Sequence, residues 1–310
     1  MEKPLIVITG HTASGKTRLA TKLAFNLNAE VISADSRQIY KYMDIGTGKD
    51  LDEYTVNNLP ISYHLIDNHL PGYEYNVFEF QHNFFSIYNK LTRENKQSIL
   101  CGGTGLYIEA VLKAFKLFPV PQNEVLRTTL ELNTLSELSK KLAELRDLHN
   151  VSDIDTKKRA IRAIEIELYY KEHEKEIVKY TSPENIVFAI NLPVEERWQR
   201  IHQRLTNRLD QGMISEVENL LSLGLTSEQI KYYGLEYKYT MLLIEKKLTK
   251  EEYINQLYLA IRQFAKRQMT YLRHMEKNGI KLHWIDGRLD DETKLEQIFE
   301  KLKQFYPSVY

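Results

Sequence analysis

The sequence has little of three things that would place it in a specialised class of protein: cysteine, net charge and long apolar segments. Cys101 is its single cysteine, so no disulfide can form within the chain and nothing points to an oxidising compartment. Its 42 Lys and Arg residues balance 42 Asp and Glu residues, which argues against an unspecific polyanion binder but allows a local basic groove. No stretch approaches the ~20 apolar residues that span a bilayer, and the N-terminal apolar run is too short for a signal peptide. We therefore expect a soluble, cytoplasmic protein with no membrane partner.

The hydrophobic pattern is typical of an α/β protein. With 310 residues, of which 43% are hydrophobic and 27% charged, the chain has room for two globular domains. Short, continuously apolar runs alternate with amphipathic segments, as in a parallel sheet whose two faces are covered by helices. The expected strands are Leu5–Thr9, Ala29–Ala34, Ser62–Ile66, Ser98–Cys101, Ile186–Asn191 and Lys281–Ile285.

Between residues 122 and 183 the pattern changes to helices alone. Two long helices are expected there, over residues 124–148 and 156–178, with no strand between them. We interpret residues 122–183 as a helical insertion in a core formed by residues 1–121 and 184–310. Later in the core, the pattern predicts helices over residues 194–223 and 250–277.

A glycine-containing loop follows the first expected strand. Residues 10–17 match the pattern G-x-x-x-x-G-K-[ST], in which backbone N–H groups and the positive end of the next helix surround phosphate oxygens. Lys16 would add a charge there, and the Thr17 hydroxyl could hold Mg²⁺. ATP is the usual ligand of such a loop, yet the same loop would hold any diphosphate. The predicted nucleotide- or diphosphate-binding residues are Gly10, His11, Thr12, Ala13, Ser14, Gly15, Lys16 and Thr17.

Two aspartates, Asp35 and Asp67, follow expected strands and would lie at the carboxyl edge of the sheet, where ligands of α/β proteins bind. Either could support the metal of a P-loop enzyme, or simply cap a turn. Asp35 is favoured because the next three residues, Ser36-Arg37-Gln38, can hydrogen-bond a base edge or a phosphate. A second glycine loop, residues 101–107, would present the Thr104 hydroxyl, although a plain strand-to-helix turn also explains its glycines.

Basic residues are grouped rather than spread evenly along the chain. Residues 254–275 contain several bases and no acid, and a second group, residues 157–162, opens the later insertion helix. Arg200, Arg204 and Arg208 share one helix face, where each like-charge pair costs about 0.2–0.5 kcal/mol unless an anion neutralises it. Each group could be a solvated helix face, but three of them in a chain of zero net charge favour a polyanionic partner.

Together these motifs resemble those of the bacterial tRNA dimethylallyltransferases, also called tRNA isopentenyltransferases. The resemblance implies a P-loop NTPase-like parallel sheet flanked by helices, with a helical insertion domain. It implies transfer of a dimethylallyl group from dimethylallyl diphosphate to N6 of the adenosine adjacent (3′) to the anticodon in tRNAs, with release of diphosphate. The matching segments occur in the family's order over nearly the whole chain: Gly10–Thr17, Asp35–Tyr40, Met43–Thr47, His64–Asp67, Gly102–Tyr107, Arg159–Ala163, Glu216-Val217 and Gln263–Thr270.

The resemblance also implies roles for individual residues. Asp35 would take the proton from the adenine N6 amine, because that amine is a poor nucleophile. Thr104 would orient the adenine or the diphosphate. Either Arg204 or Arg208 would complete the anion clamp, and the sequence does not decide which of the two. Mg²⁺ at Thr17 is the expected cofactor.

The expected partner is the tRNA anticodon stem-loop, gripped by the insertion, residues 122–183. We expect a monomer, because the tRNA itself supplies the large partner surface. The expected tRNA-contacting residues are Asp35, Ser36, Arg37, Gln38, Thr104, Arg127, Lys158, Arg159, Ala160, Ile161 and Arg162, together with Lys266 and Arg267 of the late basic group.

Four places depart from the family's pattern. His11 stands where Pro is usual, and His274 where Arg is common. Residues 234–238 read Gly-Leu-Glu-Tyr-Lys instead of containing Gly-Tyr-Lys-Glu, which leaves the role of that turn open. The segment from Asp210 to Glu216 is about one helical turn short, a change that would keep the same helix face.

Three other functions remain open from the sequence. The first is a P-loop kinase that acts on a small molecule or a nucleoside, and the second is an adenylate isopentenyltransferase. The third is an RNA-binding protein that has lost catalysis. The insertion and its basic residues favour tRNA as the substrate over a free nucleotide.

Overall fold

The computed structural model describes residues 3–146, 154–173 and 179–309. The chain divides into two compact units, one of residues 1–113 and 182–310 and the other of residues 114–181. The second unit begins at residue 114 rather than at the expected residue 122.

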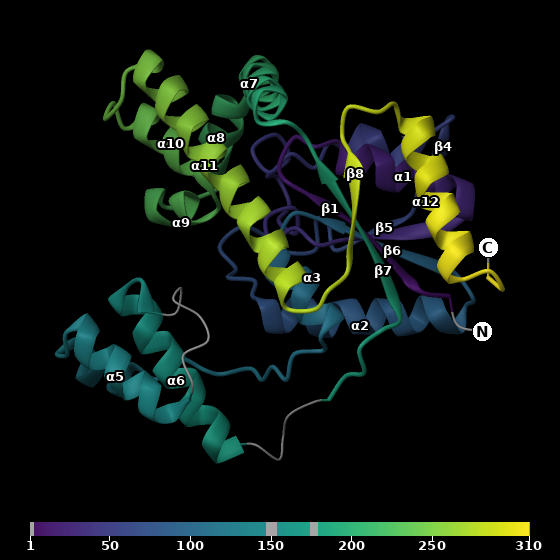
Figure 1. Cartoon of the computed structure of the whole chain (residues 1–310). Helices are drawn as coiled ribbons and strands as arrows, with labels where there is room; N and C mark the ends of the chain where they lie inside the picture. The colour runs from purple at the N-terminus through teal and green to yellow at the C-terminus, as the bar shows by residue number, and fades with distance from the viewer. Residues whose placement is uncertain (1–2, 147–153, 174–178, 310) are drawn as a thin grey trace. The chain divides into compact units, whose positions relative to one another are not determined.

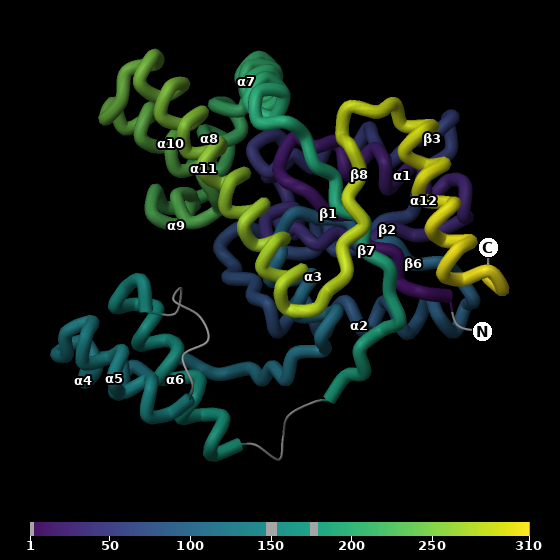
Figure 2. The backbone as a smooth tube through the Cα atoms, in the orientation of Figure 1, coloured from purple at the N-terminus to yellow at the C-terminus, as the bar shows by residue number. Residues whose placement is uncertain are grey.

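A six-stranded parallel sheet forms the centre of the first unit, in the order β5-β2-β6-β1-β7-β8. All six expected strands are confirmed, and so is the α/β fold class. Every residue of β1 and β6 is buried, as expected for central strands of a sheet covered on both faces. Figure 2 shows β8, near the end of the chain, beside β7. The strands are β1 (Leu5–Gly10), β2 (Ala29–Ser33), β5 (Tyr63–His64), β6 (Gln97–Gly102), β7 (Asn185–Asn191) and β8 (Leu282–Asp286).

Helices cover both faces of this sheet (Figure 1). On one face, α1 (Lys16–Leu27) and α12 (Asp291–Phe305) pack together and share a hydrophobic core with β1 and β7. Helix α3 (Gly105–Leu112) contacts both α2 (Val77–Arg93) and α11 (Lys250–Lys277). Helices α2 and α3 pack on β6, and α11 packs on β1. A short element that the sequence analysis did not predict follows β2: the 3₁₀ helix η1 (Leu51–Tyr54) and the hairpin of β3 (Thr55–Val56) and β4 (Leu59–Pro60).

The later helices of the first unit form a second hydrophobic core around Leu205, Met213 and Leu257. The single helix expected over residues 194–223 is wrong, because Gly212, with φ 100°, interrupts it. Asp210 and Glu216 consequently lie on different helices, so the expectation that the short segment keeps them on one helix face is wrong. This core takes residues from α7 (Val194–Asp210), α8 (Met213–Ser222), α10 (Leu235–Ile244) and α11. The short helix α9 (Ser227–Tyr232) lies between α8 and α10 in sequence.

The second unit contains α4 (Glu124–Glu131), α5 (Leu135–Leu145) and α6 (Lys157–His173), packed around Leu138, Leu142 and Ile161. The expected single helix over residues 124–148 is wrong, because Thr134 starts a new helix. Its side chain accepts the N–H of Glu137, and the Glu137 side chain accepts the N–H of Thr134. Expected helical residues 147–148 and 174–178 lie outside the described residues. Among the residues that the structure describes, no helix is long and apolar enough to cross a membrane.

Candidate active site

The predicted phosphate loop connects β1 to α1, and residues 12–17 line a cavity of about 780 Å³. Gly10 lies directly against the neighbouring strand, where a Cβ would be 2.9 Å from the carbonyl oxygen of Ile190. Gly15 has φ 80°, and this left-handed conformation turns the chain into α1. The loop thus presents its backbone to the cavity at the positive end of a helix, as anion binding requires.

Lys16 is half-buried in the wall of this cavity. Its Nζ donates a long hydrogen bond, 3.5 Å, to the carbonyl oxygen of His11. Burial lowers the pKa of Lys16, and the nearby Arg204 guanidinium lowers it further. Because an anion would neutralise both cations, this pair favours a negatively charged ligand in the cavity.

His11 lies behind the loop, with its side chain fully buried. Its Nδ1–H donates to the carbonyl oxygen of Thr12 at 2.7 Å. Burial lowers the pKa of His11 from 6.5 to about 4, so its ring is neutral near pH 7. The side chain thus packs inside the core, and neither His11 nor Gly10 lines the cavity.

Asp35 and Thr104 follow neighbouring strands, β2 and β6, and both line the cavity. The Asp35 carboxylate is oriented by the N–H of Arg37, which donates to Asp35 Oδ1 at 2.9 Å. The Thr104 hydroxyl accepts the N–H of Ser36 at 3.2 Å. At Gly102 a Cβ would lie 2.2 Å from the carbonyl oxygen of Ala34, so the two loops approach closely only because this residue is glycine.

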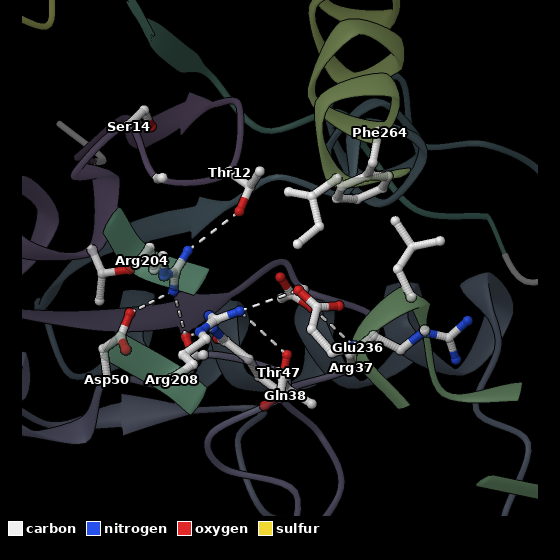
Figure 3. Close-up of a pocket in the computed structure, with 18 of the residues that line it drawn as sticks. Thr12, Ser14, Arg37, Gln38, Thr47, Asp50, Arg204, Arg208, Glu236 and Phe264 are labelled. Atoms are coloured by element: carbon white, nitrogen blue, oxygen red, sulfur yellow. Dashed lines mark hydrogen bonds and ion pairs between the residues drawn. The ribbon is translucent and has the colours of Figure 1, made fainter. Parts of the chain in front are cut away.

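Arg204 and Arg208 both project from α7 into the same cavity (Figure 3). Arg204 donates to Thr12 Oγ1 at 3.2 Å and pairs with Asp50 Oδ2 at 2.6 Å. Arg208 contacts Glu236 Oε1 at 3.2 Å, and burial lowers its pKa to about 10. Both arginines are therefore placed at the phosphate loop or beside it.

Arg200, the third arginine of the predicted stripe, also lines the cavity but donates to the carbonyl oxygen of Gly287 at 3.2 Å. Gly48 makes room for the two others, since a Cβ there would lie 1.6 Å from Arg208 Nη2 and 2.3 Å from Arg204 Nη2. The arginines thus depend on the path of the loop that contains Gly48, residues 43–50.

Two residues to which the sequence analysis gave no role hold that loop. Glu216 accepts the N–H groups of Asp44, Ile45 and Gly46 at 2.7, 2.7 and 2.9 Å, and also the hydroxyl of Tyr237. Lys49, whose side chain is fully buried, binds the loop from within. Its Nζ donates to the carbonyl oxygen of Tyr40 at 2.7 Å and pairs with Asp44 Oδ1 at 2.5 Å and with Asp67.

The pairing with Lys49 also separates the two candidate aspartates. Asp67 is held by the buried ammonium of Lys49 and does not line the cavity, whereas Asp35 does. Among the described residues no group of three or more His, Cys, Asp or Glu could hold a metal ion.

Ser36, Arg37 and Gln38 line the cavity as a group. The Arg37 guanidinium lies 4.9 Å from the ring centroid of Tyr232, a cation–π contact. Gln38 is buried, and its amide is held at both ends: Ser33 Oγ donates to it at 2.9 Å, and it donates to the carbonyl oxygen of Gly48 at 2.9 Å. Gln38 therefore supports the loop of residues 43–50.

The late basic group divides between two places. Arg267 lines the cavity and lies 6.0 Å from the ring centroid of Phe264, which lines it too. Lys266 does not line the cavity, and its Nζ lies 5.9 Å from the ring of Trp198. The Arg262 guanidinium contacts the same ring, at 4.6 Å.

In the second unit, Arg127 and Arg162 both bind the buried carboxylate of Glu165. Lys158 and Arg159 are exposed, the latter paired with Asp155 at 3.0 Å. The side chains of Ala160 and Ile161, expected among the tRNA contacts, are buried in the core of this unit, so that expectation is wrong for their side chains.

Comparison with known proteins shows to which family this chain belongs. Residues 38–275 match the family described as IPP transferase, and residues 3–64 match the one described as isopentenyl transferase. The chain belongs to the IPP transferase family. It is 54% identical to tRNA dimethylallyltransferase 1 of Parabacteroides distasonis over 94% of this chain and 95% of that one. It is 51% identical to tRNA dimethylallyltransferase 2 of Phocaeicola vulgatus over 97% and 99%.

Solved structures agree with this membership. The full-length tRNA isopentenylpyrophosphate transferase of Bacillus halodurans superposes with a TM-score of 0.70 and 29% identity, over 98% of this chain and 96% of that one. A eukaryotic dimethylallyltransferase acting on tRNA shares the fold, with a TM-score of 0.73 at 22% identity, over 92% and 74%. In this chain, the segment of residues 234–238 supplies Glu236, the partner of Arg208.

Proposed function

We propose that the protein transfers a dimethylallyl group from dimethylallyl diphosphate to N6 of the adenosine adjacent (3′) to the anticodon in tRNAs, releasing diphosphate. One observation carries the proposal: in a member of this family, the phosphate loop, Asp35, Thr104 and the pair Arg204–Arg208 line one cavity of about 780 Å³. The enzyme is thus a prenyltransferase whose P-loop stabilises a departing diphosphate.

The diphosphate is held by the N–H groups of residues 13–17, by Lys16 and by the arginines of α7. Negative charge develops on the leaving oxygen as the bond from C1 of the dimethylallyl group breaks, and these cations stabilise it. Their depressed pKa values, at Lys16 and Arg208, support this role, because an anion would offset the desolvation that lowers them. Both arginines contribute to the clamp, Arg204 at the loop and Arg208 behind it.

Thr17 would hold Mg²⁺ together with the diphosphate oxygens and water. A donor set with one hydroxyl and few carboxylates fits this ion, which commonly keeps several waters and binds substrate phosphates. When bound, Mg²⁺ would neutralise charge on the leaving diphosphate. Thr17 lines the cavity next to Lys16, in the first turn of α1.

Asp35 is the general base. The N6 lone pair of adenine attacks C1 of the dimethylallyl group, the C1–O bond breaks with its electron pair going to the diphosphate, and the N6 proton passes to Asp35. The hydrogen bond from the N–H of Arg37 holds the carboxylate in place. Thr104 orients the adenine or the diphosphate from the opposite loop.

The target adenosine leaves its stack to enter the cavity, as enzymes that modify bases require. Ser36, Arg37 and Arg267 are proposed to contact the tRNA at the cavity. The helical unit of residues 114–181 is proposed to grip the anticodon stem-loop with exposed bases such as Lys158 and Arg159. A cytoplasmic monomer suits this reaction, because tRNA is found there and supplies the partner surface itself.

Incubation of the protein with dimethylallyl diphosphate, Mg²⁺ and unmodified tRNA, followed by mass spectrometry of the nucleosides, tests the proposal. We expect adenosine that carries one dimethylallyl group, next to the anticodon. Prenylation of free adenylate but not of tRNA would instead identify an adenylate isopentenyltransferase. Transfer of phosphate from ATP to a small molecule, without prenylation, would identify a kinase.

A further inference from the structure

The arginine that reaches the phosphate loop is already paired with a carboxylate of this chain. Arg204 Nη2 lies 2.6 Å from Asp50 Oδ2, while its Nη1 donates to Thr12 Oγ1 at 3.2 Å. All three side chains line the cavity, and Figure 3 shows the guanidinium between Thr12 and Asp50. Asp50 thus occupies a donor of Arg204 at the place where a diphosphate would bind.

The local backbone directs Asp50 toward this contact. Asp50 directly precedes η1, where an aspartate commonly accepts N–H groups of the helix, yet its side chain makes no capping hydrogen bond. Its φ is 45°, a left-handed conformation that few residues other than glycine, asparagine and aspartate adopt. The carboxylate of Asp50 thus leaves the N-terminus of η1 uncapped and instead faces Arg204.

Asp50 also acts electrostatically on its neighbours. Burial and then Arg204 lower the pKa of Lys16, and the charge of Asp50 opposes that change. Burial raises the pKa of Glu53, and Asp50 raises it further. A diphosphate would bring several negative charges to the same place, so it and Asp50 would repel each other.

We propose that Asp50 is a displaceable counter-ion that limits the affinity of Arg204 for diphosphate. The inference rests on the proposed diphosphate site. Without ligand, Asp50 neutralises Arg204; a bound diphosphate takes its place on the guanidinium. After prenyl transfer Asp50 pairs with Arg204 again, which weakens the hold on the product diphosphate and speeds its release.

Binding of inorganic pyrophosphate with Mg²⁺ to the full chain, measured by isothermal titration calorimetry, tests this proposal. Asp50→Asn removes the charge, and asparagine tolerates a left-handed backbone. We expect this variant to bind pyrophosphate about five- to tenfold more tightly, and to be more strongly inhibited by it during turnover. The matched control is Asp52→Asn, which removes the same charge from an exposed residue of the same turn and should change the affinity less than about twofold.

If Asp50 only supports Arg204, removal of its charge should not increase the affinity for pyrophosphate. If Asp50 only positions Arg204, Asp50→Asn will bind pyrophosphate equally well or more weakly, and the proposal is overturned. Asp50→Gly gives a second test, since glycine adopts this φ without strain. In an Arg204→Gln background only the direct repulsion between Asp50 and pyrophosphate remains, so the effect of Asp50→Asn should be much smaller, and an undiminished effect would also overturn the proposal. If the wild-type chain binds no pyrophosphate, the proposed diphosphate site itself fails; wild-type binding with no gain in Asp50→Asn rejects the counter-ion role alone.

Discussion

The side chain of Gln268 accepts a hydrogen bond from the backbone N–H of Thr12, at 2.8 Å. Its other end, Nε2, donates to the carbonyl oxygen of Gly103 at 3.0 Å. One amide of α11 thus joins the phosphate loop to the second glycine loop. At Gly103 a Cβ would lie 2.5 Å from Gln268 Nε2, so this bridge depends on glycine at that position. Helix α11 therefore fixes the distance between the phosphate loop and the second glycine loop.

Removal of this bridge should weaken diphosphate binding. In Gln268→Ala the phosphate loop loses an acceptor for the Thr12 N–H, and we expect the KM for dimethylallyl diphosphate to rise about tenfold, as one lost hydrogen bond permits. The affinity for tRNA should change little. Steady-state kinetics and filter binding measure the two effects, with Gln263→Ala, an exposed glutamine of the same helix, as the control. A wild-type KM in Gln268→Ala would contradict the role of this bridge.

Glu216 should matter for both stability and catalysis. Its carboxylate accepts three successive backbone N–H groups of the loop that surrounds Gly48, so Glu216→Gln places an amide donor against these donors. We expect unfolding free energy to fall by about 1–3 kcal/mol. Pyrophosphate should also bind more weakly, because the loop determines where Arg204 and Arg208 lie.

Urea denaturation and calorimetry of Glu216→Gln measure these effects. Glu218→Gln, two residues further along α8 and exposed, is the matched control and should match the wild type in both. A loss of stability without any change in pyrophosphate affinity would show that the loop does not position the arginines.

The sheet and the phosphate loop were predictable because their signals are local. A continuously apolar strand such as β1, and the glycine pattern after it, can be recognised without knowing what they contact. The start of α5 was also predictable, since Thr134 and Glu137 have the spacing of a capping box. The apolar periodicity across residues 124–148 led instead to the prediction of one continuous helix. The break between α7 and α8 had a similar signal in Gly212.

The supporting contacts of the site were not predictable in this way. Glu216 is 172 residues from Asp44 in sequence, and Gln268 is 256 residues from Thr12. The sequence around each of these residues gives no sign of its partner. The packing of α8 brings Glu216 to Asp44, and the packing of α11 brings Gln268 to Thr12. The pairs Arg204–Asp50 and Arg208–Glu236 are further examples, because a helix-face argument predicted the arginines but not their carboxylates.

The buried imidazole of His11 should make folding stability depend on pH. Burial lowers its pKa from 6.5 to about 4, so the unfolded chain binds a proton at a pH where the folded chain does not. The stability contributed by the neutral ring is present above pH 6.5 and is lost as the pH falls toward 4. Between pH 7 and pH 5 this amounts to about 2 kcal/mol.

Urea denaturation of the wild type and of His11→Gln at several pH values isolates this contribution. We expect the wild type to lose about 2 kcal/mol more than the variant between pH 7 and pH 5, whatever other groups contribute to both. Parallel curves would mean that His11 is protonated normally in the folded chain.

Asp35 carries the chemical step in the proposed reaction, so its charge should matter for turnover and not for tRNA binding. Asp35→Asn keeps the acceptor for the N–H of Arg37 but cannot take the proton of N6. We expect the single-turnover rate with saturating tRNA and dimethylallyl diphosphate to fall about 10²–10⁴-fold, as for loss of a general base. Filter binding should give a tRNA affinity close to that of the wild type.

Asp67→Asn is the informative comparison, because Asp67 also follows a strand but pairs with Lys49 outside the cavity. That variant should lose stability while its rate per folded molecule stays within about tenfold of the wild type. An unchanged rate in Asp35→Asn would remove Asp35 from the role of base, since no other step assigned to this carboxylate requires its charge.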